Sequence, residues 1–317
     1  MFDFRYHLVS LAAVFIALAV GILLGAAISG KLGDAEDALM KDRLASVNDQ
    51  LTQERARSDI VERRSQAAEE LLGDAYPALM TNRLEGKNYA VLFLGPVDGT
   101  ERSAVERTLA DADGGSPARL VALDTPINPG DLDATLQSDE QLARYAAGGD
   151  DFGDLGEALG RDLVAGEGAP LWSSLSSRLI EERSGTTSGA VDGVIVVKTW
   201  KEPETLGDAQ QQSETNATES LFEGLVRGLE STGLPVVGVE PSSGESDVAL
   251  FRQQGVSSVD DVDTVPGRLA LALLLAGAEP GHYGVKDTAT DGVAPPDRKS
   301  TRLNSSHSLT SRMPSSA

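Results

Sequence analysis

Three aspartates near the C-terminal end of the sequence have the residue type and spacing that could bind a cation. Asp260, Asp261 and Asp263 follow a predicted strand, and parallel sheets often place functional groups at the carboxyl ends of their strands. Carboxylate oxygens are the ligands that hard cations prefer. His282 is a further candidate ligand, in a glycine-rich turn after an apolar helix. The spacing fits no EF-hand loop, so turn, cap and helix C-terminal roles are the alternatives.

Other sequence patterns that support catalysis are missing. The segment Gly95–Gly99 lies between a predicted strand and a predicted helix, but it lacks G-x-G-x-x-G spacing, and no G-x-x-x-x-G-K-[ST] motif occurs. A serine nucleophile needs a positioned base, yet His282 is the only histidine of the predicted folded domain, and no G-x-S-x-G elbow is present. The sequence has no cysteine. We therefore predict a protein that is not an enzyme and needs no cofactor.

The charge of the chain excludes one class of partner. The 317 residues include 27 Lys and Arg against 49 Asp and Glu, a net charge of −22 at pH 7. A protein that reads nucleic-acid phosphates needs a basic face. We therefore expect no nucleic-acid partner.

The candidate ligands lie in a predicted α/β domain that covers residues 77–296. Short apolar runs predict strands at 87–95, 118–123, 193–197 and 235–239. Helical spacing predicts helices at 100–112, 218–230 and 266–278, with Thr100 and Asn216 as caps of the first two. Polar, glycine-rich helices are expected between residues 131 and 183. Alternating strands and helices predict a mainly parallel sheet in a three-layer α/β sandwich.

Residues 1–30 read as a transmembrane anchor. Residues 8–28 carry no charge, and a helix of that length crosses a hydrocarbon core of roughly 30 Å. Arg5 precedes the run and acidic residues follow it, which favours a cytoplasmic N-terminus and an extracytoplasmic C-terminal domain. The alternative is a cleaved signal peptide, because Ala27-Ile28-Ser29 has the form of a cleavage site.

Small residues recur at every fourth position of this apolar run. They share one face of the predicted helix and include a Gly-x-x-x-Gly pair, the spacing that lets two helices approach closely in lipid. We predict a homodimer that associates through this face. The alternative is that small residues are common in membrane helices and that this pattern does not mediate association. The residues of the face are Ala13, Ala17, Gly21 and Gly25.

Residues 31–76 predict a helical stalk that ends near Gly73 and Pro77. Apolar residues recur with heptad spacing, which is typical of a coiled coil. The seam is diluted by polar residues such as Glu54 and Ser58, so the alternative is a helix that lies on the following domain. The apolar seam residues are Leu44, Val47, Leu51, Val61 and Leu72.

The tail, residues 297–317, differs from the rest of the chain because it is basic and rich in serine. Its sequence resembles a translated sequencing adapter, so we expect a non-native, disordered segment and exclude it from the fold. A native disordered tail is the alternative.

Motifs at both ends of the chain resemble those of the MctB family of bacterial copper transport proteins. The first comprises Arg5-Tyr6-His7, Ser10-Leu11, the run from Ala13 to Ala19, Gly21 and Gly25. The second comprises Ser258–Asp263, Pro266-Gly267-Arg268 and Gly281-His282-Tyr283-Gly284. The resemblance implies a role in copper tolerance and efflux across the bacterial envelope. It also implies an envelope protein partner, since related members are linked to envelope and division complexes.

The residue chemistry and this resemblance point in different directions. Copper(I) prefers thiolate and thioether sulfur, and apart from the initiator and the tail the only methionines are Met40 and Met80. Copper is thus expected by resemblance only. The alternative hypothesis is a non-enzymatic, dimeric coiled-coil scaffold that is held in membrane lipid and presents an α/β interaction domain to envelope or division complexes.

Overall fold

The computed structural model describes residues 4–146, 149–165, 170–185, 189–203 and 207–296, and within the first helix it describes the side chains of residues 10–26, 40–41 and 43–80. Contacts divide the chain into two compact units, residues 1–69 and 70–317. The predicted tail at 297–317 lies outside the described residues. The predicted domain boundaries at residues 30 and 76 remain predictions.

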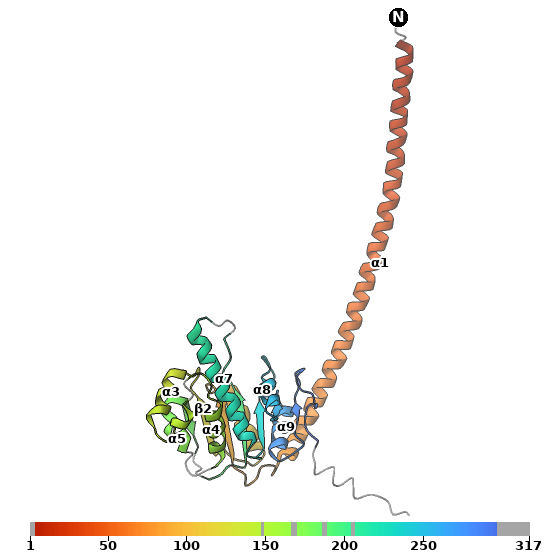
Figure 1. Cartoon of the computed structure of the whole chain (residues 1–317). Coiled ribbons are helices and arrows are strands. Elements are labelled where there is room, and N and C mark those ends of the chain that lie inside the picture. The colour runs from red at the N-terminus through yellow and green to blue at the C-terminus, as the bar shows by residue number, and fades with distance from the viewer. Residues whose placement is uncertain (1–3, 147–148, 166–169, 186–188, 204–206, 297–317) are drawn as a thin grey trace, which may run out of the picture. The chain divides into compact units, whose positions relative to one another are not determined.

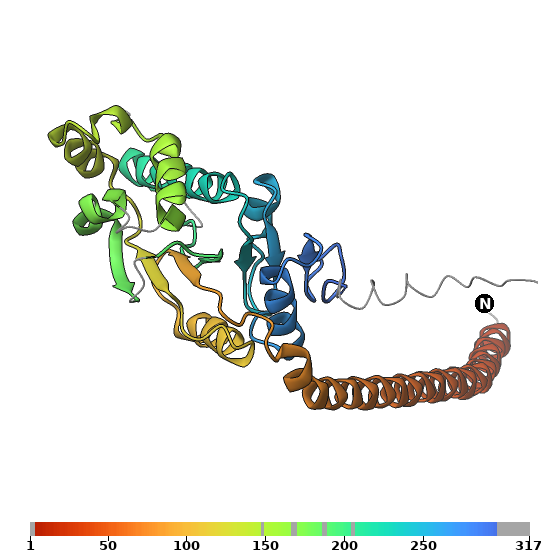
Figure 2. The same cartoon turned by 90° about the horizontal axis from the view of Figure 1, so that it is seen from below.

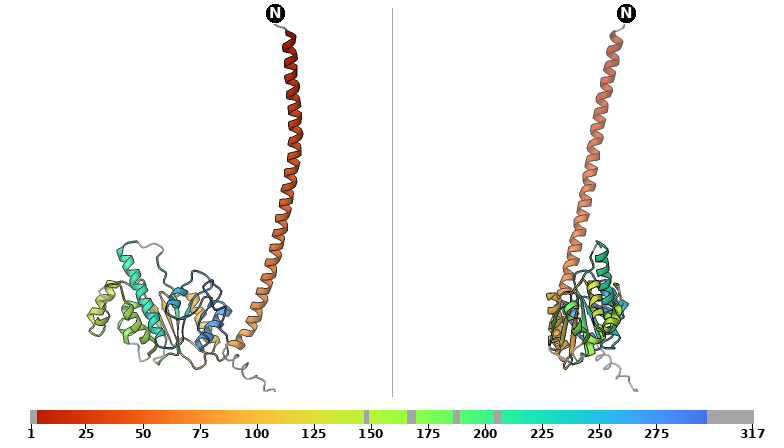
Figure 3. Two further views of the ribbon diagram at one scale, coloured as in Figure 1. Left: turned by 45° about the vertical axis from the view of Figure 1, so that its right-hand side comes forward. Right: turned by 60° about the vertical axis from the view of Figure 1, so that its left-hand side comes forward.

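The first element is one long helix, α1 (Phe4–Met80), which Figures 1 and 3 show as a continuous ribbon. The helix was predicted to end near Gly73 and Pro77, and it continues through both residues to Met80. Its last turns belong to the second unit, where Tyr76 and Met80 are buried in the core. Tyr76 donates a hydrogen bond of 3.0 Å to the Asp111 carboxylate, and the Arg268 guanidinium lies 5.6 Å from the centre of its ring. Tertiary packing thus extends the helix beyond its sequence signals for termination.

The described part of the chain contains no helix with both the length and the apolar composition that a membrane crossing requires. Residues 8–9 and 27–28, the ends of the predicted span, lie outside the described side chains.

The second unit is built on a seven-stranded sheet with the order β3-β2-β1-β4-β5-β6-β7. Every neighbouring pair is parallel except β2 and β3, which are antiparallel. The central strands β1 and β4 are almost fully buried, as expected for parallel strands that are covered on both faces. The strands are β1 (Tyr89–Leu94), β2 (Arg119–Leu123), β3 (Ile180–Ser184), β4 (Gly193–Lys198), β5 (Val236–Val239), β6 (Ser257–Val259) and β7 (His282–Tyr283).

Helices cover both faces of this sheet, with α2 and α9 on one side and α4 and α7 on the other (Figure 2). A hydrophobic core lies on each face of the sheet, and the side chains of β1 alternate between the two cores. Ala90 and Leu92 pack with the α4 and α7 side, whereas Val91 and Phe93 pack with the α2 and α9 side. The helices are α2 (Gly99–Asp111), α3 (Pro129–Ser138), the 3₁₀ turn η1 (Ala143–Tyr145), α4 (Gly153–Ala165), α5 (Pro170–Ser174), α6 (Ser176–Leu179), α7 (Ala209–Glu230), α8 (Val248–Gln253) and α9 (Val265–Leu275).

The mainly parallel sheet with interleaved helices confirms the predicted α/β class, but several element boundaries differ from the prediction. Residues 180–184 form an antiparallel edge strand where helix was expected. Helix α2 is capped by Asp98 rather than Thr100. Helix α7 begins at Ala209 under an Asp208 cap, so Asn216 is not a cap. In both helices the aspartate accepts a hydrogen bond from the first turn, which fixes the start of the helix.

Candidate functional site

The predicted acidic cluster lies at the carboxyl end of β6, but its side chains serve different partners. Asp260 is 1% exposed and accepts hydrogen bonds from the backbone N–H groups of Val285 at 2.8 Å and Lys286 at 3.3 Å. Its carboxylate occupies the space that a Cβ on Gly284 would need, and Gly284 has a φ of +144°. Asp260 therefore fastens the segment after β7 to the end of β6.

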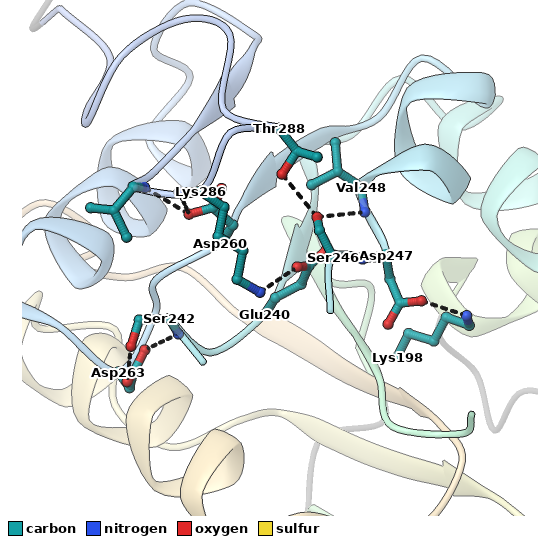
Figure 4. A network of polar contacts seen from close by, with 11 residues as sticks. Lys198, Glu240, Ser242, Ser246, Asp247, Val248, Asp260, Asp263, Lys286 and Thr288 are labelled. Atoms are coloured by element: carbon teal, nitrogen blue, oxygen red, sulfur yellow. Dashed lines mark hydrogen bonds and ion pairs between the residues drawn. The ribbon is translucent and has the colours of Figure 1, made fainter. Parts of the chain in front are cut away.

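The side chains of Asp261 and Asp263 form hydrogen bonds with other residues than Asp260 does. The buried Asp261 accepts a hydrogen bond from the Thr264 hydroxyl at 2.9 Å, and burial raises its pKa to about 6. Asp263 accepts from the backbone N–H of Ser242 at 2.6 Å and from its hydroxyl at 2.8 Å (Figure 4). The backbone oxygen of Asp263 also accepts from Arg268 at 2.9 Å.

His282 lies on β7, opposite Ser258 of β6. Its Nδ1 is 3.0 Å from the Ser258 hydroxyl, and burial lowers its pKa, with Arg252 acting in the same direction. In the described ranges no three His, Cys, Asp or Glu side chains are placed to share a metal ion. The four predicted ligands thus hold turns and strand ends in this arrangement.

A network of polar contacts that the sequence analysis missed runs along the same edge of the sheet (Figure 4). Glu240 follows β5, is 3% exposed, and forms a 3.0 Å ion pair with Lys286. Its other oxygen accepts from the backbone N–H of Asp247 at 2.7 Å, while the Asp247 carboxylate pairs with Lys198 at 2.6 Å. Burial raises the pKa of Glu240, and the hydrogen bond from Lys286 opposes that rise.

The network had a signal in the sequence. Lys198 is the last residue of the apolar strand β4, Glu240 directly follows the apolar strand β5, and Asp260 directly follows β6. Because the carboxyl ends of parallel strands meet at one edge, charged residues at these positions must lie close together.

A small cavity adjoins the network where β1, β4 and β5 end. It measures about 160 Å³, and its wall includes Asp98, Glu101, Lys201, Glu240 and Asp247. Glu101, in the first turn of α2, is only 8% exposed, and its Oε2 has no hydrogen-bond partner. Burial, reinforced by the negative charge of Asp98, raises the Glu101 pKa to about 7. Glu101 could not be singled out from its sequence context, because a glutamate in the first turn of a helix is usual.

The other predicted interaction residues lie on α1. The side chains of Leu44, Val47, Leu51 and Val61 are 50–65% exposed. Leu72 instead packs against the core of the second unit. This contact is of the kind expected from the alternative interpretation, a helix that lies on the following domain. Along the predicted dimer face, Ala13, Ala17, Gly21 and Gly25 are exposed.

The methionines are separated. Met80 is fully buried in the core, and Met40 is 63% exposed on α1. The described residues therefore provide no clustered sulfur ligands of the kind that copper(I) prefers.

Comparison with known proteins supplies the family. Residues 1–294 match the family described as "Copper transport outer membrane protein, MctB". Proteins named "Copper transporter MctB" from Mycobacterium bovis and Mycobacterium tuberculosis are 24% identical over 310 residues, covering 90% of this chain and 96% of each relative. A family match over nearly the whole chain shows that the chain belongs to the MctB family of copper transport proteins.

Proposed function

We propose that this protein takes part in copper efflux as a self-associating, membrane-anchored component of the bacterial envelope. MctB is a family of transport proteins, and membership of it implies a membrane or envelope protein. The observation that carries the copper role is the family match over residues 1–294.

The N-terminal segment supplies the proposed anchor. The uncharged run from residue 8 to residue 28 is followed by acidic residues, and its described side chains, 10–26, are exposed. Leu23 is 70% exposed and Ile16 65%. A helix that is apolar all round needs a hydrophobic environment to cover it, and lipid provides one. Resistance to extraction by alkaline carbonate supports the anchor, and release of the intact chain into the soluble fraction contradicts it.

Self-association follows from the transport role. One span per chain cannot enclose a conduit, so a path for copper has to come from several copies or from a partner. The apolar side chains of α1 at Leu44, Val47, Leu51 and Val61 suit a seam between two copies.

A strain that lacks the gene tests the copper role. We expect growth to be inhibited at several-fold lower copper concentrations than in the parent, with unchanged sensitivity to zinc. Return of the gene should restore tolerance. Equal copper sensitivity of the deleted and parent strains would remove the copper role.

A second candidate function is a dimeric scaffold that presents the α/β domain to an envelope protein. It is favoured by the exposed apolar seam residues together with the absence of a three-ligand metal cluster from the described residues. Crosslinking in intact membranes distinguishes the two candidates. A scaffold should be captured with the same partners whether or not copper is added, whereas a copper pathway predicts that copper changes the captured set.

A further inference from the structure

The cavity at the ends of β1, β4 and β5 lies at the topological switch point of the sheet. From β1 the chain moves to β2 on one side, and from β4 it moves to β5 on the other. Helix α2, after β1, and helix α7, after β4, cover opposite faces. In open parallel sheets, ligands bind in the crevice that this divergence leaves at the carboxyl ends of the strands.

Glu101 is the residue of this cavity whose surroundings indicate a bound ligand. The side chain is more than nine-tenths buried, and its Oε2 is shielded from solvent without a hydrogen-bond donor. A buried carboxylate oxygen without a donor is costly, and proteins keep few such groups. The Asp98 carboxylate does not help, because it accepts from the backbone N–H groups of Thr100 and Glu101.

The charge of the wall decides the kind of ligand. Lys198 is paired with Asp247, and Glu240 is paired with Lys286. Outside these pairs, the described residues of the wall include Asp98, Glu101 and Glu245 against one cation, Lys201. The remaining negative charge repels phosphates and carboxylates and attracts cations.

The size and donor arrangement narrow the choice further. A cavity of about 160 Å³ admits a molecule of a few heavy atoms. In the described residues no group of three ligand side chains is placed to hold a metal ion. An ammonium group, in contrast, needs only acceptors within hydrogen-bond reach, and it donates three hydrogen bonds.

We propose that this cavity binds a small molecule through an ammonium group, which pairs with the carboxylate of Glu101. The site lies entirely within the second unit and uses none of the residues of the α1 seam.

Ethylammonium is a suitable probe, measured by isothermal titration calorimetry on the full chain in detergent at pH 8. We expect saturable binding of one probe per chain. Glu101→Gln should weaken it at least tenfold, since the substitution removes the buried charge at nearly constant shape. Glu181→Gln, on the exposed face of β3, is the matched control and should bind like the wild type.

Lys201→Ala provides an independent measurement if Glu101→Gln does not fold. Lys201 is exposed, so its removal leaves the core intact. Loss of this cation should tighten ethylammonium binding several-fold. No saturable binding to the folded wild type, unchanged affinity in Glu101→Gln, or weaker binding in Lys201→Ala would each overturn the proposal, as would tighter binding of inorganic phosphate than of ethylammonium.

Discussion

At the residue scale, the C-terminal family motifs are explained by packing. Gly284 has a φ of +144°, in a region that L side chains rarely adopt, and the Asp260 carboxylate lies where its Cβ would be. Gly267 is placed similarly, because a Cβ there would overlap with the backbone oxygen of Asp261. These residues fit one another closely, which accounts for the combination of aspartates and glycines in the C-terminal motif.

Gly284→Ala should lower the free energy of unfolding by about 2–4 kcal/mol, because it combines an unfavourable φ with a steric overlap. Urea denaturation followed by tryptophan fluorescence measures this, since both tryptophans, Trp172 and Trp200, are buried in the second unit. Gly277→Ala is the matched control: its φ is +85° but no atom lies within 4 Å of the added Cβ. It should cost only about 1 kcal/mol. Equal losses in both variants would show that the Asp260 contact contributes nothing.

Glu101 should make stability depend on pH. Burial raises its pKa in the folded state from 4.5 to about 7, so the folded chain binds this proton more tightly than the unfolded chain. The resulting stabilisation is complete below pH 4.5 and is lost as the pH rises through 7. Glu101→Gln should therefore match the wild type below pH 4.5 and exceed its free energy of unfolding by at most about 3 kcal/mol above pH 7. A difference that does not vary between pH 4 and pH 8 would contradict the buried, ionisable state of Glu101.

The chemistry of single residues was only partly predictable from the sequence. The position of Asp260, Asp261 and Asp263 after a strand was predicted, and Thr264 is a local neighbour of Asp261. The partners Lys286 and Ser242 could not be predicted, because they become neighbours only through the order of β5, β6 and β7 in the sheet. Whether these carboxylates ever hold a cation stays a prediction.

At the element scale, helices α4 and α7 pack together at glycines. A Cβ on Gly156 or Gly160 of α4 would overlap with the α7 backbone, and a Cβ on Gly224 or Gly228 of α7 would overlap with the α4 side. The two backbones are therefore in direct contact, which glycine alone permits. The spacing by four places the glycines of each helix on one face.

Gly224→Ala should cost at least about 3 kcal/mol, since the overlap involves the backbone oxygen of Gly153 and neither helix can yield without moving. Thermal unfolding monitored by circular dichroism tests this. Gly73→Ala in α1 is the control, because no atom lies within 4 Å of the added Cβ. It should be neutral or stabilise the helix by up to about 1 kcal/mol. Destabilisation of both variants to the same degree would mean that the close approach of α4 and α7 is unimportant.

The buried, apolar strands could be predicted from the sequence, whereas the polar or very short strands at the edges of the sheet could not. Strands β1, β4 and β5 are continuous apolar runs, because they are buried on both faces. Strand β3 is short, polar and half exposed at an edge, and β7 has only two residues. Such strands are defined by their neighbours rather than by their own residues. The packing role of the α4 and α7 glycines could not be predicted, since it depends on which helix lies opposite.

At the scale of the whole molecule, the chain joins a folded domain without a sulfur cluster in its described residues to a helix that exposes apolar side chains. The proposed copper role therefore predicts that the chain assembles through this helix. Leu51 is 50% exposed and belongs to the predicted seam, so Leu51→Asp should disrupt self-association, whereas Gln53→Asp, off the seam on the same helix, should not. Analytical ultracentrifugation in detergent should show a dimer for the wild type and Gln53→Asp and a monomer for Leu51→Asp. A monomeric wild type would contradict the seam.

The most direct test of the copper role is the copper content of cells grown with added copper, measured by mass spectrometry. A strain without the gene should hold several-fold more copper than the parent. The wild-type gene and Gln53→Asp should restore the parental value, while Leu51→Asp should not. A deleted strain with the same copper content as its parent would contradict the account.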